Sequence, residues 1–389
     1  MKTEPAKQTC ARIALMLPRF SLYGGVEQFG FRLAAGLAER GHRVDFICAR
    51  REQNPPPGVR VLCVGRPFGP RFFKMLWFLL RAERFRRKGA YDLSLSLGKT
   101  WGQDLIRMGG GPLKVFWEKS ETAIEPGLKR CLKKITRRLS LANLLTLFIE
   151  KRQFTRESRV IAVSHLVRDW LLKAYPELDP DKVSVIYNQP DTTRFTRPEP
   201  EERTKARRAL LANSPFATDL ENIDDLIFIG TASTNFQLKG VDKLIRALAL
   251  LPEKTLLFIA GGRGASPYTA LAASLGLAER VIFTGKTKDM PAFYKALDIF
   301  ALPTFYDACS NVVLEALASG CKTLTSTSNG ASFFLEDEAL LRDPADVQDL
   351  AERIRICMVK PRPETFVWPR ETPSGLLAFM EEMENILKK

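Results

Sequence analysis

The chain is poor in the residues on which several common chemistries depend. It has 389 residues but only two histidines, so a histidine-rich metal site or a Ser-His-Asp triad has almost no material. Its seven cysteines are odd in number and show no paired spacing, which indicates a reducing compartment. The longest apolar run, residues 139–149, is far shorter than the roughly 20 residues that span a bilayer.

The N-terminal region has no secretory hydrophobic segment before the strand-like run at residues 13–17. We therefore expect a cytoplasmic protein, at most peripheral to the inner face of the cytoplasmic membrane. Acidic residues are scarce in residues 1–200, where 37 Lys and Arg face 19 Asp and Glu, giving +18. The remainder has 22 against 25, or −3, which completes the net charge of +15. An anionic partner should therefore meet the first half.

The length predicts two domains. In the first half, strand patterns at 12–17, 44–48, 59–64, 91–97, 160–163 and 183–187 alternate with helix patterns, as in a doubly wound parallel sheet. Residues 190–208 form a linker-like break, and a second alternating series begins at 226. The domains are predicted at 1–200 and 201–370. A last helix is predicted at 371–389.

The most informative segment is residues 304–316, with Asp307 and Glu315 eight residues apart. It predicts a strand-end loop followed by a helix from Ser310 to Ser319, with Ser310 as its N-cap and its end near Gly320. The free N–H groups at such a helix start favour a diphosphate, and Glu315 could accept hydrogen bonds from ribose hydroxyls. If helical geometry held throughout, Glu315 would lie about 12 Å along the axis from Asp307 and be turned by about 80°. The segment therefore indicates a nucleotide-diphosphate site.

The layout resembles the Asp/Glu-x7-Glu signature of retaining glycosyltransferases of family GT4. The resemblance extends from residues 24–27 through 185–188, 239–242, 258–264 and 281–285 to 329–330. It is closest to the bacterial glucosyltransferases that build the lipopolysaccharide core. It implies the α/β GT-B fold, in which two Rossmann-like doubly wound parallel-sheet domains face each other across a cleft. It also implies a nucleotide-sugar donor, no metal and no other cofactor. In this fold the last helix, here 371–389, is expected to cross back to the first domain.

The resemblance assigns roles to individual residues. Lys239 and Asp307 are expected to be catalytic, with Lys239 stabilising the departing diphosphate. Glu27 and Arg107 are expected on the acceptor side. The expected donor-binding residues are Gly24, Gly25, Gly261, Arg263, Thr287, Cys309, Ser310, Asn311 and Glu315.

Two departures from the family pattern bear on these assignments. The family usually places an Arg beside the lysine, but Leu238 precedes Lys239 and residues 231–237 contain no Arg. Arg263 is a candidate substitute. Asp307 stands where the family usually has Glu, and it is shorter by one C–C bond, about 1.5 Å. Asp307 could instead cap the following turn, and Lys239 could be a solvated residue at a helix start.

Two basic segments contain interleaved aromatic residues. Residues 66–88 hold eight Lys and Arg with one acid, and residues 114–138 hold eight with three acids. Such segments suit an anionic membrane surface, although the aromatic side chains could equally belong to the core.

We therefore expect a retaining glycosyltransferase that moves a hexose, glucose in the first instance, from a UDP-sugar. The expected acceptor is a lipid-linked or lipopolysaccharide-core saccharide at the inner membrane surface. One alternative is a nucleic-acid-binding protein that uses the basic half, although no nucleic-acid-binding motif is found. The other is a GT-B relative that has lost activity.

Overall fold

The computed structural model describes residues 10–154, 158–212, 220–262, 264–364, 366–369 and 371–388. The chain divides into two compact units. The first unit comprises Met1–Phe116, Gly127–Asn188 and Glu371–Lys389, and the second comprises Trp117–Pro126 and Gln189–Arg370. The boundary therefore follows Asn188 rather than residue 200, and residues 117–126 group with the second unit.

The first unit is built on a seven-stranded parallel sheet with strand order β5-β3-β1-β6-β7-β8-β9. The strands are β1 (Arg12–Met16), β3 (Arg43–Cys48), β5 (Val59–Cys63), β6 (Leu93–Ser96), β7 (Leu105–Met108), β8 (Arg159–Ala162) and β9 (Val183–Val185). A separate pair joins β2 (Arg19–Phe20) to β4 (Arg50–Arg51). The helices are α1 (Gly25–Glu39), α2 (Arg71–Gly89), α4 (Leu128–Leu139), α5 (Leu141–Phe154), α6 (His165–Ala174) and α13 (Gly375–Leu387). Helix α3 (Leu113–Thr122) begins in this unit, and its residues from 117 onward group with the second unit.

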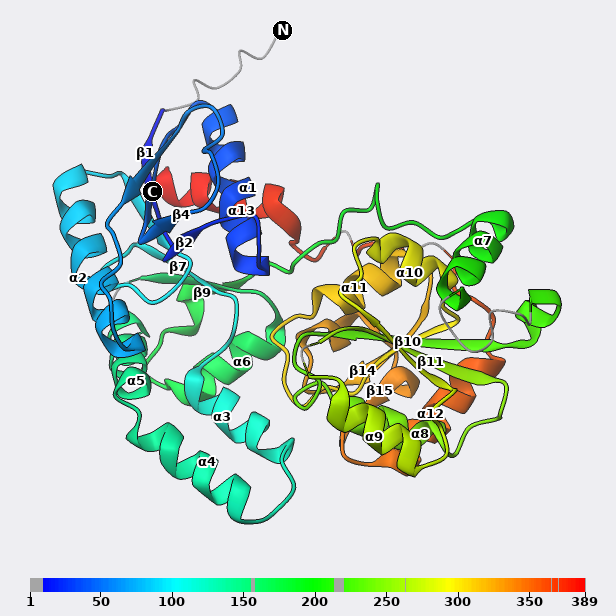
Figure 1. The fold of residues 1–389 in the computed structure, drawn as a ribbon. Coiled ribbons are helices and arrows are strands. Elements are labelled where there is room, and N and C mark those ends of the chain that lie inside the picture. The colour runs from blue at the N-terminus through cyan, green and yellow to red at the C-terminus, as the bar shows by residue number, and fades with distance from the viewer. Residues whose placement is uncertain are drawn as a thin grey trace, which may run out of the picture. The chain divides into compact units, whose positions relative to one another are not determined.

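The C-terminal helix α13 packs on α1 of the first unit, and the two lie side by side in Figure 1. The Phe29 and Phe379 rings meet edge to face with centroids 5.1 Å apart, and Arg40 pairs with Glu384 at 2.8 Å. Gly36 makes the close approach possible, since a Cβ there would lie 2.8 Å from the Met380 sulfur. The last helix thus joins the unit formed by the start of the chain.

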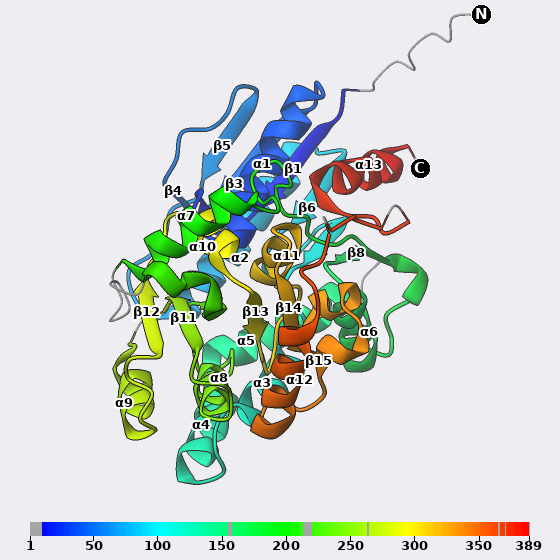
Figure 2. The ribbon, with the colours of Figure 1, turned by 90° about the vertical axis from the view of Figure 1, so that its right-hand side faces the viewer.

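The second unit is built on a six-stranded parallel sheet with order β12-β11-β10-β13-β14-β15. Its strands are β10 (Ile227–Ser233), β11 (Thr255–Gly261), β12 (Val281–Gly285), β13 (Ile299–Leu302), β14 (Lys322–Ser326) and β15 (Leu340–Leu341). Its helices are α7 (Pro200–Leu211), α8 (Val241–Leu248), α9 (Ser266–Ser274), α10 (Met290–Ala296), α11 (Asn311–Ala318) and α12 (Val347–Val359). Helices α8, α9 and α12 lie on one face, and α7, α10 and α11 on the other (Figure 2).

Both sheets have the strand order of a doubly wound nucleotide-binding fold, so the predicted fold class is confirmed. The order reverses between β1 and β6 in the first unit and between β10 and β13 in the second. Ligands of such sheets bind outside the carboxyl ends of the strands at this reversal. In the second unit, Lys239 and Asp307 follow the two strands that meet there.

The linker predicted over residues 201–208 is wrong, because these residues belong to α7. Pro200 stands at the first helical position, and Glu199 and Glu202 form a reciprocal capping box. Arg207 of this helix is almost fully buried and pairs with Asp298 at 2.9 Å. The helix is therefore fixed by a long-range contact that its charged local sequence does not reveal.

Candidate active site

The candidate site lies in the second unit, at the carboxyl ends of β10 and β13. The loop after β10 delivers Lys239, and its shape comes from Asn235, whose side-chain oxygen accepts the Leu238 N–H at 3.2 Å. Gly240 then opens α8 with φ 65°, and a Cβ at this position would lie 2.3 Å from the Pro303 carbonyl oxygen. Glycine is required here for both reasons, and the close approach brings the lysine loop against the loop after β13.

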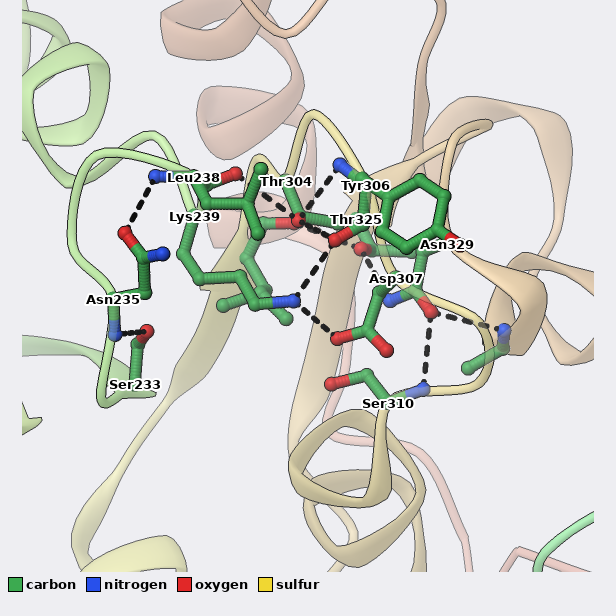
Figure 3. A network of polar contacts seen from close by, with 12 residues as sticks. Ser233, Asn235, Leu238, Lys239, Thr304, Tyr306, Asp307, Ser310, Thr325 and Asn329 are labelled. Atoms are coloured by element: carbon green, nitrogen blue, oxygen red, sulfur yellow. Dashed lines mark hydrogen bonds and ion pairs between the residues drawn. The ribbon is translucent and has the colours of Figure 1, made fainter. Parts of the chain in front are cut away.

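Lys239 and Asp307 form an ion pair across these two loops (Figure 3). The lysine Nζ lies 2.5 Å from Asp307 Oδ2 and donates to the Tyr306 carbonyl at 3.1 Å. Both side chains are mostly buried, with 16% and 19% exposed. The structure therefore joins the two residues expected to be catalytic, 68 positions apart in the chain, in one contact. The ammonium is held at the edge of the sheet rather than extended into solvent.

Asn329, which follows β14, connects its own loop to the turn after Asp307 (Figure 3). Its fully buried side-chain oxygen accepts the N–H groups of Ser310 and Ala331, each at 3.1 Å, and its amide nitrogen donates to Thr325 at 3.0 Å. Asp307 itself pairs with Asn329 in an isolated parallel bridge. The cap-type contact to Ser310 thus comes from Asn329 rather than from Asp307. Ser310 N–H, expected to meet the pyrophosphate, is already bonded in this structure.

The helix that carries Glu315 has Ser310 at its N-cap and Ser319 at its C-cap, as the sequence predicted. Helix α11 begins at Asn311, four residues after Asp307, so a continuous helical relation between Asp307 and Glu315 is wrong. Cys309 and Ser310 are buried in the preceding turn, whereas Asn311 is exposed at the first helical position. The Ser310 N–H, which has no partner within α11, is bonded to Asn329.

Glu315 is half-buried on α11 and accepts a hydrogen bond at Oε2 from the Tyr294 hydroxyl at 2.9 Å. Burial raises the pKa of Glu315 to about 7, whereas the Tyr294 hydrogen bond and the charge of Arg194 act to lower it. The carboxyl group therefore lies close to the balance between its neutral and ionised forms at neutral pH. Ligand hydroxyls that donate to it would favour the ionised form.

The other expected donor residues lie at the ends of β11 and β12. Gly261 ends β11 with φ 83°, and a Cβ there would lie 2.5 Å from the Ser233 carbonyl oxygen. Thr287 lies after β12, where its hydroxyl is 3.0 Å from that of Thr284. Arg263, the candidate substitute for the family's arginine, falls outside the described residues.

Four expected residues lie in the first unit. Gly24 and Gly25 follow β1 and open α1, as the glycine pair predicted, with Gly24 at φ 110°. Glu27 lies on the first turn and pairs with Arg19 at 3.0 Å. Arg107 is buried on β7, with its guanidinium 3.9 Å from the centre of the Phe29 ring.

The side chain of Arg107 also donates to Asn188 at 2.8 Å, so the structure gives it internal contacts. The strand that carries it, β7, was not predicted as a strand, because its four residues run directly into Gly109-Gly110-Gly111. These four residues form a strand because they pair with β6 on one side and β8 on the other, and the local sequence pattern does not show this pairing.

Comparison with known proteins decides the family. Residues 23–194 match the family model described as Glycosyltransferase Family 4, and residues 224–359 match the model described as Glycosyl transferases group 1. The chain belongs to the GT4 family of glycosyltransferases. The first model covers most of the first unit and parts of the second, whereas the other model lies within the second unit and includes Lys239, Asp307 and Glu315.

Among curated relatives of this GT4 chain, the lipopolysaccharide glucosyltransferase WaaG of Escherichia coli is 33% identical over 129 residues. That match covers 31% of this chain and about a third (34%) of WaaG. A D-inositol 3-phosphate glycosyltransferase of Xylanimonas cellulosilytica is 26% identical over 351 residues, which cover 81% of this chain and 78% of the relative. The names of these two relatives thus specify different acceptors, lipopolysaccharide in one and D-inositol 3-phosphate in the other.

Solved structures share the fold. The crystal structure of WaaG superposes with a TM-score of 0.71 at 21% identity, with 90% of each chain covered. HepE of Anabaena, in complex with UDP and glucose, superposes with a TM-score of 0.67 at 17% identity, covering 97% of this chain and all (100%) of HepE. The GT-B fold is thereby confirmed.

Sequence reasoning missed two residues that complete the geometry of the site. Tyr294 sits on α10 among aromatic residues, and its sequence context gives no sign that its hydroxyl reaches Glu315. Asn329 was noted only as part of the resemblance. An asparagine just after a strand and just before a glycine is a signal for a backbone-binding turn, and it could have been used.

Proposed function

We propose that the protein is a retaining hexosyltransferase that uses a UDP-sugar, with UDP-glucose as the first candidate donor. The observation that carries this proposal is the contact between Lys239 and Asp307 at the strand-order reversal, with Glu315 on the adjoining helix. In this assignment Lys239 stabilises the diphosphate, Asp307 contacts the sugar and Glu315 accepts the ribose hydroxyls. The name of the relative WaaG, a glucosyltransferase, and the crystal structure of HepE with UDP and glucose support this choice of donor.

The reaction that we propose needs no metal or redox partner. The acceptor hydroxyl oxygen forms a bond to C1 of the hexose on the face that the diphosphate leaves, and the bond from C1 to the β-phosphate oxygen breaks. The electron pair stays on UDP, and the acceptor proton passes to the phosphate. Lys239 neutralises the charge that develops on the leaving group, an effect worth several kcal/mol at a preorganised site.

We further propose that the acceptor is a lipid-linked, phosphorylated saccharide such as the lipopolysaccharide core, met at an anionic membrane surface by the first unit. Helix α4 supports this idea, because no residue of it is buried. Its apolar side chains recur at Leu128, Leu132, Ile135 and Leu139, and its other positions include six Lys and Arg and no acid. Such a helix favours the interface of an anionic bilayer. Among the described residues no helix is long and apolar enough to cross one.

Neighbouring helices extend this surface. Helix α5 packs against both α2 and α4 in the first unit (Figure 1) and exposes Leu144 and Phe148, while α2 exposes Phe73 and Trp77. The aromatic residues of the basic segments are thus partly on the surface, which favours membrane contact over a purely structural role.

The donor is tested by titrating the protein with UDP-glucose, UDP-galactose, UDP-N-acetylglucosamine, GDP-mannose and ADP-heptose. We expect selective binding of UDP-glucose, lost in Glu315→Ala without loss of folding. Binding of none of the five would support a relative that has lost activity. Unchanged binding by Glu315→Ala would refute the role of Glu315.

The membrane surface is tested by sedimentation with vesicles of phosphatidylcholine alone and with added phosphatidylglycerol. We expect binding only to the anionic vesicles, reduced in Lys129→Glu/Lys134→Glu on α4. The matched control is Lys205→Glu/Arg208→Glu on exposed positions of α7, which should bind as the wild type does. Salt-sensitive binding to nucleic acid without vesicle binding would favour the nucleic-acid alternative.

A further inference from the structure

Tyr294 is a buried polar side chain whose hydroxyl faces the candidate donor site. It lies on α10, is fully buried, and has its ring among Phe195, Phe293 and Phe300 with centroid distances of 5.5 to 5.9 Å. Its hydroxyl donates to Glu315 Oε2 at 2.9 Å. Packing from three sides fixes the ring, so the position of the hydroxyl is set before any ligand arrives.

The hydrogen bond leaves one carboxylate oxygen available. Within the described part of the chain, Glu315 Oε1 accepts no hydrogen bond, and the side chain is only half-buried. An ionised carboxylate can accept about four hydrogen bonds over its two oxygens, so two hydroxyls of a ligand can still bind. Glu315 Oε2 is thus bonded to the protein, and Oε1 can accept hydrogen bonds from a ligand.

Within the described residues, two groups act on the ionisation of the Glu315 carboxyl group besides its burial. Tyr294 approaches it from α10, and the exposed Arg194, in the segment before α7, contributes an attractive charge without forming an ion pair. Cys321, which precedes β14, contacts the Tyr294 carbonyl through its sulfur at 3.2 Å, and burial raises the pKa of this thiol to about 12, so it stays neutral. The Tyr294 hydroxyl is therefore the direct hydrogen-bond donor to Glu315.

We propose that Tyr294 is a positioning residue for donor binding: its hydroxyl orients the Glu315 carboxylate and favours the charged form that accepts the ribose hydroxyls. Tyr294 does not itself touch the ligand in this arrangement. The inference rests on the proposed donor role of Glu315, and it predicts that binding of a ribonucleotide sugar and ionisation of Glu315 are linked. Burial raises the pKa of Glu315 to about 7, so the linkage falls in an accessible pH range.

The affinity for UDP-glucose should therefore depend on pH, and it should rise as the Glu315 carboxyl group ionises. The ionised form accepts the ribose hydroxyls much more strongly than the neutral form, so affinity for UDP-glucose should rise by up to about tenfold between pH 6 and pH 8 and level off above. At pH 7, binding should release about half a proton per donor bound. UDP-glucose suits the measurement because its diphosphate diester does not titrate in this range.

The experiment is calorimetric titration of UDP-glucose into the full-length chain from pH 6 to pH 9, in two buffers of different ionisation enthalpy. Tyr294→Phe keeps the ring and removes the hydroxyl. In this variant the midpoint of the plot of UDP-glucose affinity against pH should move upward by about one pH unit. The affinity should be about fivefold weaker than that of the wild type at pH 7 and equal to it by pH 9. Proton release at pH 7 should rise toward one. Glu315→Gln should bind weakly, show no pH dependence and release no proton.

Tyr91→Phe is the matched control, because Tyr91 also donates its hydroxyl to a carboxylate, that of Asp45 at 2.7 Å, but lies in the first unit. It should leave the UDP-glucose profile unchanged. The double variant Tyr294→Phe/Glu315→Gln should bind within about twofold of Glu315→Gln alone.

The outcomes separate the two proposals. Loss of affinity in Tyr294→Phe by the same factor at every pH, or in both Glu315 backgrounds, would indicate a packing role and overturn the inference. No UDP-glucose binding by the wild type would instead refute the proposed donor.

Discussion

Replacing Lys239 with methionine removes the ammonium group while keeping most of the length and apolar surface of the side chain. In the structure that group lies 2.5 Å from Asp307 Oδ2 and 3.1 Å from the Tyr306 carbonyl, with 16% of the side chain exposed. Two consequences follow, one for stability and one for donor binding. They can be measured separately on the same variant.

The stability cost comes from leaving Asp307 without its cation. Exposed ion pairs contribute about 0.2–1 kcal/mol, and breaking a fully buried pair costs about 3–5 kcal/mol. With 19% of its side chain exposed, Asp307 lies between these limits, so we expect a loss of about 1–3 kcal/mol. For a unit of this size, that corresponds to a fall in Tm of about 2–12 °C.

The binding cost comes from losing a charge-assisted contact to the diphosphate. Such contacts contribute about 1.5–3 kcal/mol, so affinity for UDP should fall by about 10- to 150-fold. Calorimetric titration with UDP measures the affinity, and differential scanning calorimetry measures Tm. The double variant Lys239→Met/Asp307→Asn should regain part of the lost stability without regaining UDP affinity.

The control is Lys243→Met on α8, the helix that follows the loop of Lys239. Lys243 is also 16% exposed and pairs with Asp242 at 3.0 Å, but it is not assigned to the site. It should change Tm modestly and leave UDP binding intact. Wild-type affinity for UDP in Lys239→Met, with the fold intact, would refute the assignment of Lys239 to the diphosphate.

Three further changes test the framework of the site. Asn329→Ala leaves two buried N–H groups without their acceptor and should cost about 2–4 kcal/mol on thermal unfolding, whereas Asn329→Asp, which keeps an acceptor, should cost less. Gly240→Ala places a Cβ 2.3 Å from the Pro303 carbonyl oxygen and should lower the free energy of unfolding, measured by denaturant titration, by at least about 2 kcal/mol. The control Gly276→Ala, at φ 70° with open space around the Cβ, should lower it only by the backbone strain of about 1 kcal/mol. Because the pKa of Glu315 is raised to about 7 from its usual 4.5, its contribution to the stability of the ligand-free protein is full below pH 4.5 and is lost as the pH rises through 7. Melting curves of Glu315→Gln should lack that decline.

The sequence by itself determined the fold class and the place of the site. Alternating apolar strands and amphipathic helices dictate a doubly wound parallel sheet, because a strand buried on both faces must be covered by helices. The positions of Lys239 and Asp307 just after two such strands placed them at the carboxyl edge. These inferences depend only on local periodicity and chain order, which a single sequence displays.

Only the tertiary structure decided how those residues meet. Lys239 reaches Asp307, Tyr294 reaches Glu315, and Asn329 holds the turn before α11, through contacts between residues 19 to 68 positions apart. The predicted linker over 201–208 was wrong for the same reason, since α7 is held by a buried arginine at Asp298, 91 positions away. Side-chain hydrogen bonds of this kind depend on positions in space to within about half an ångström, and no spacing along the chain encodes them.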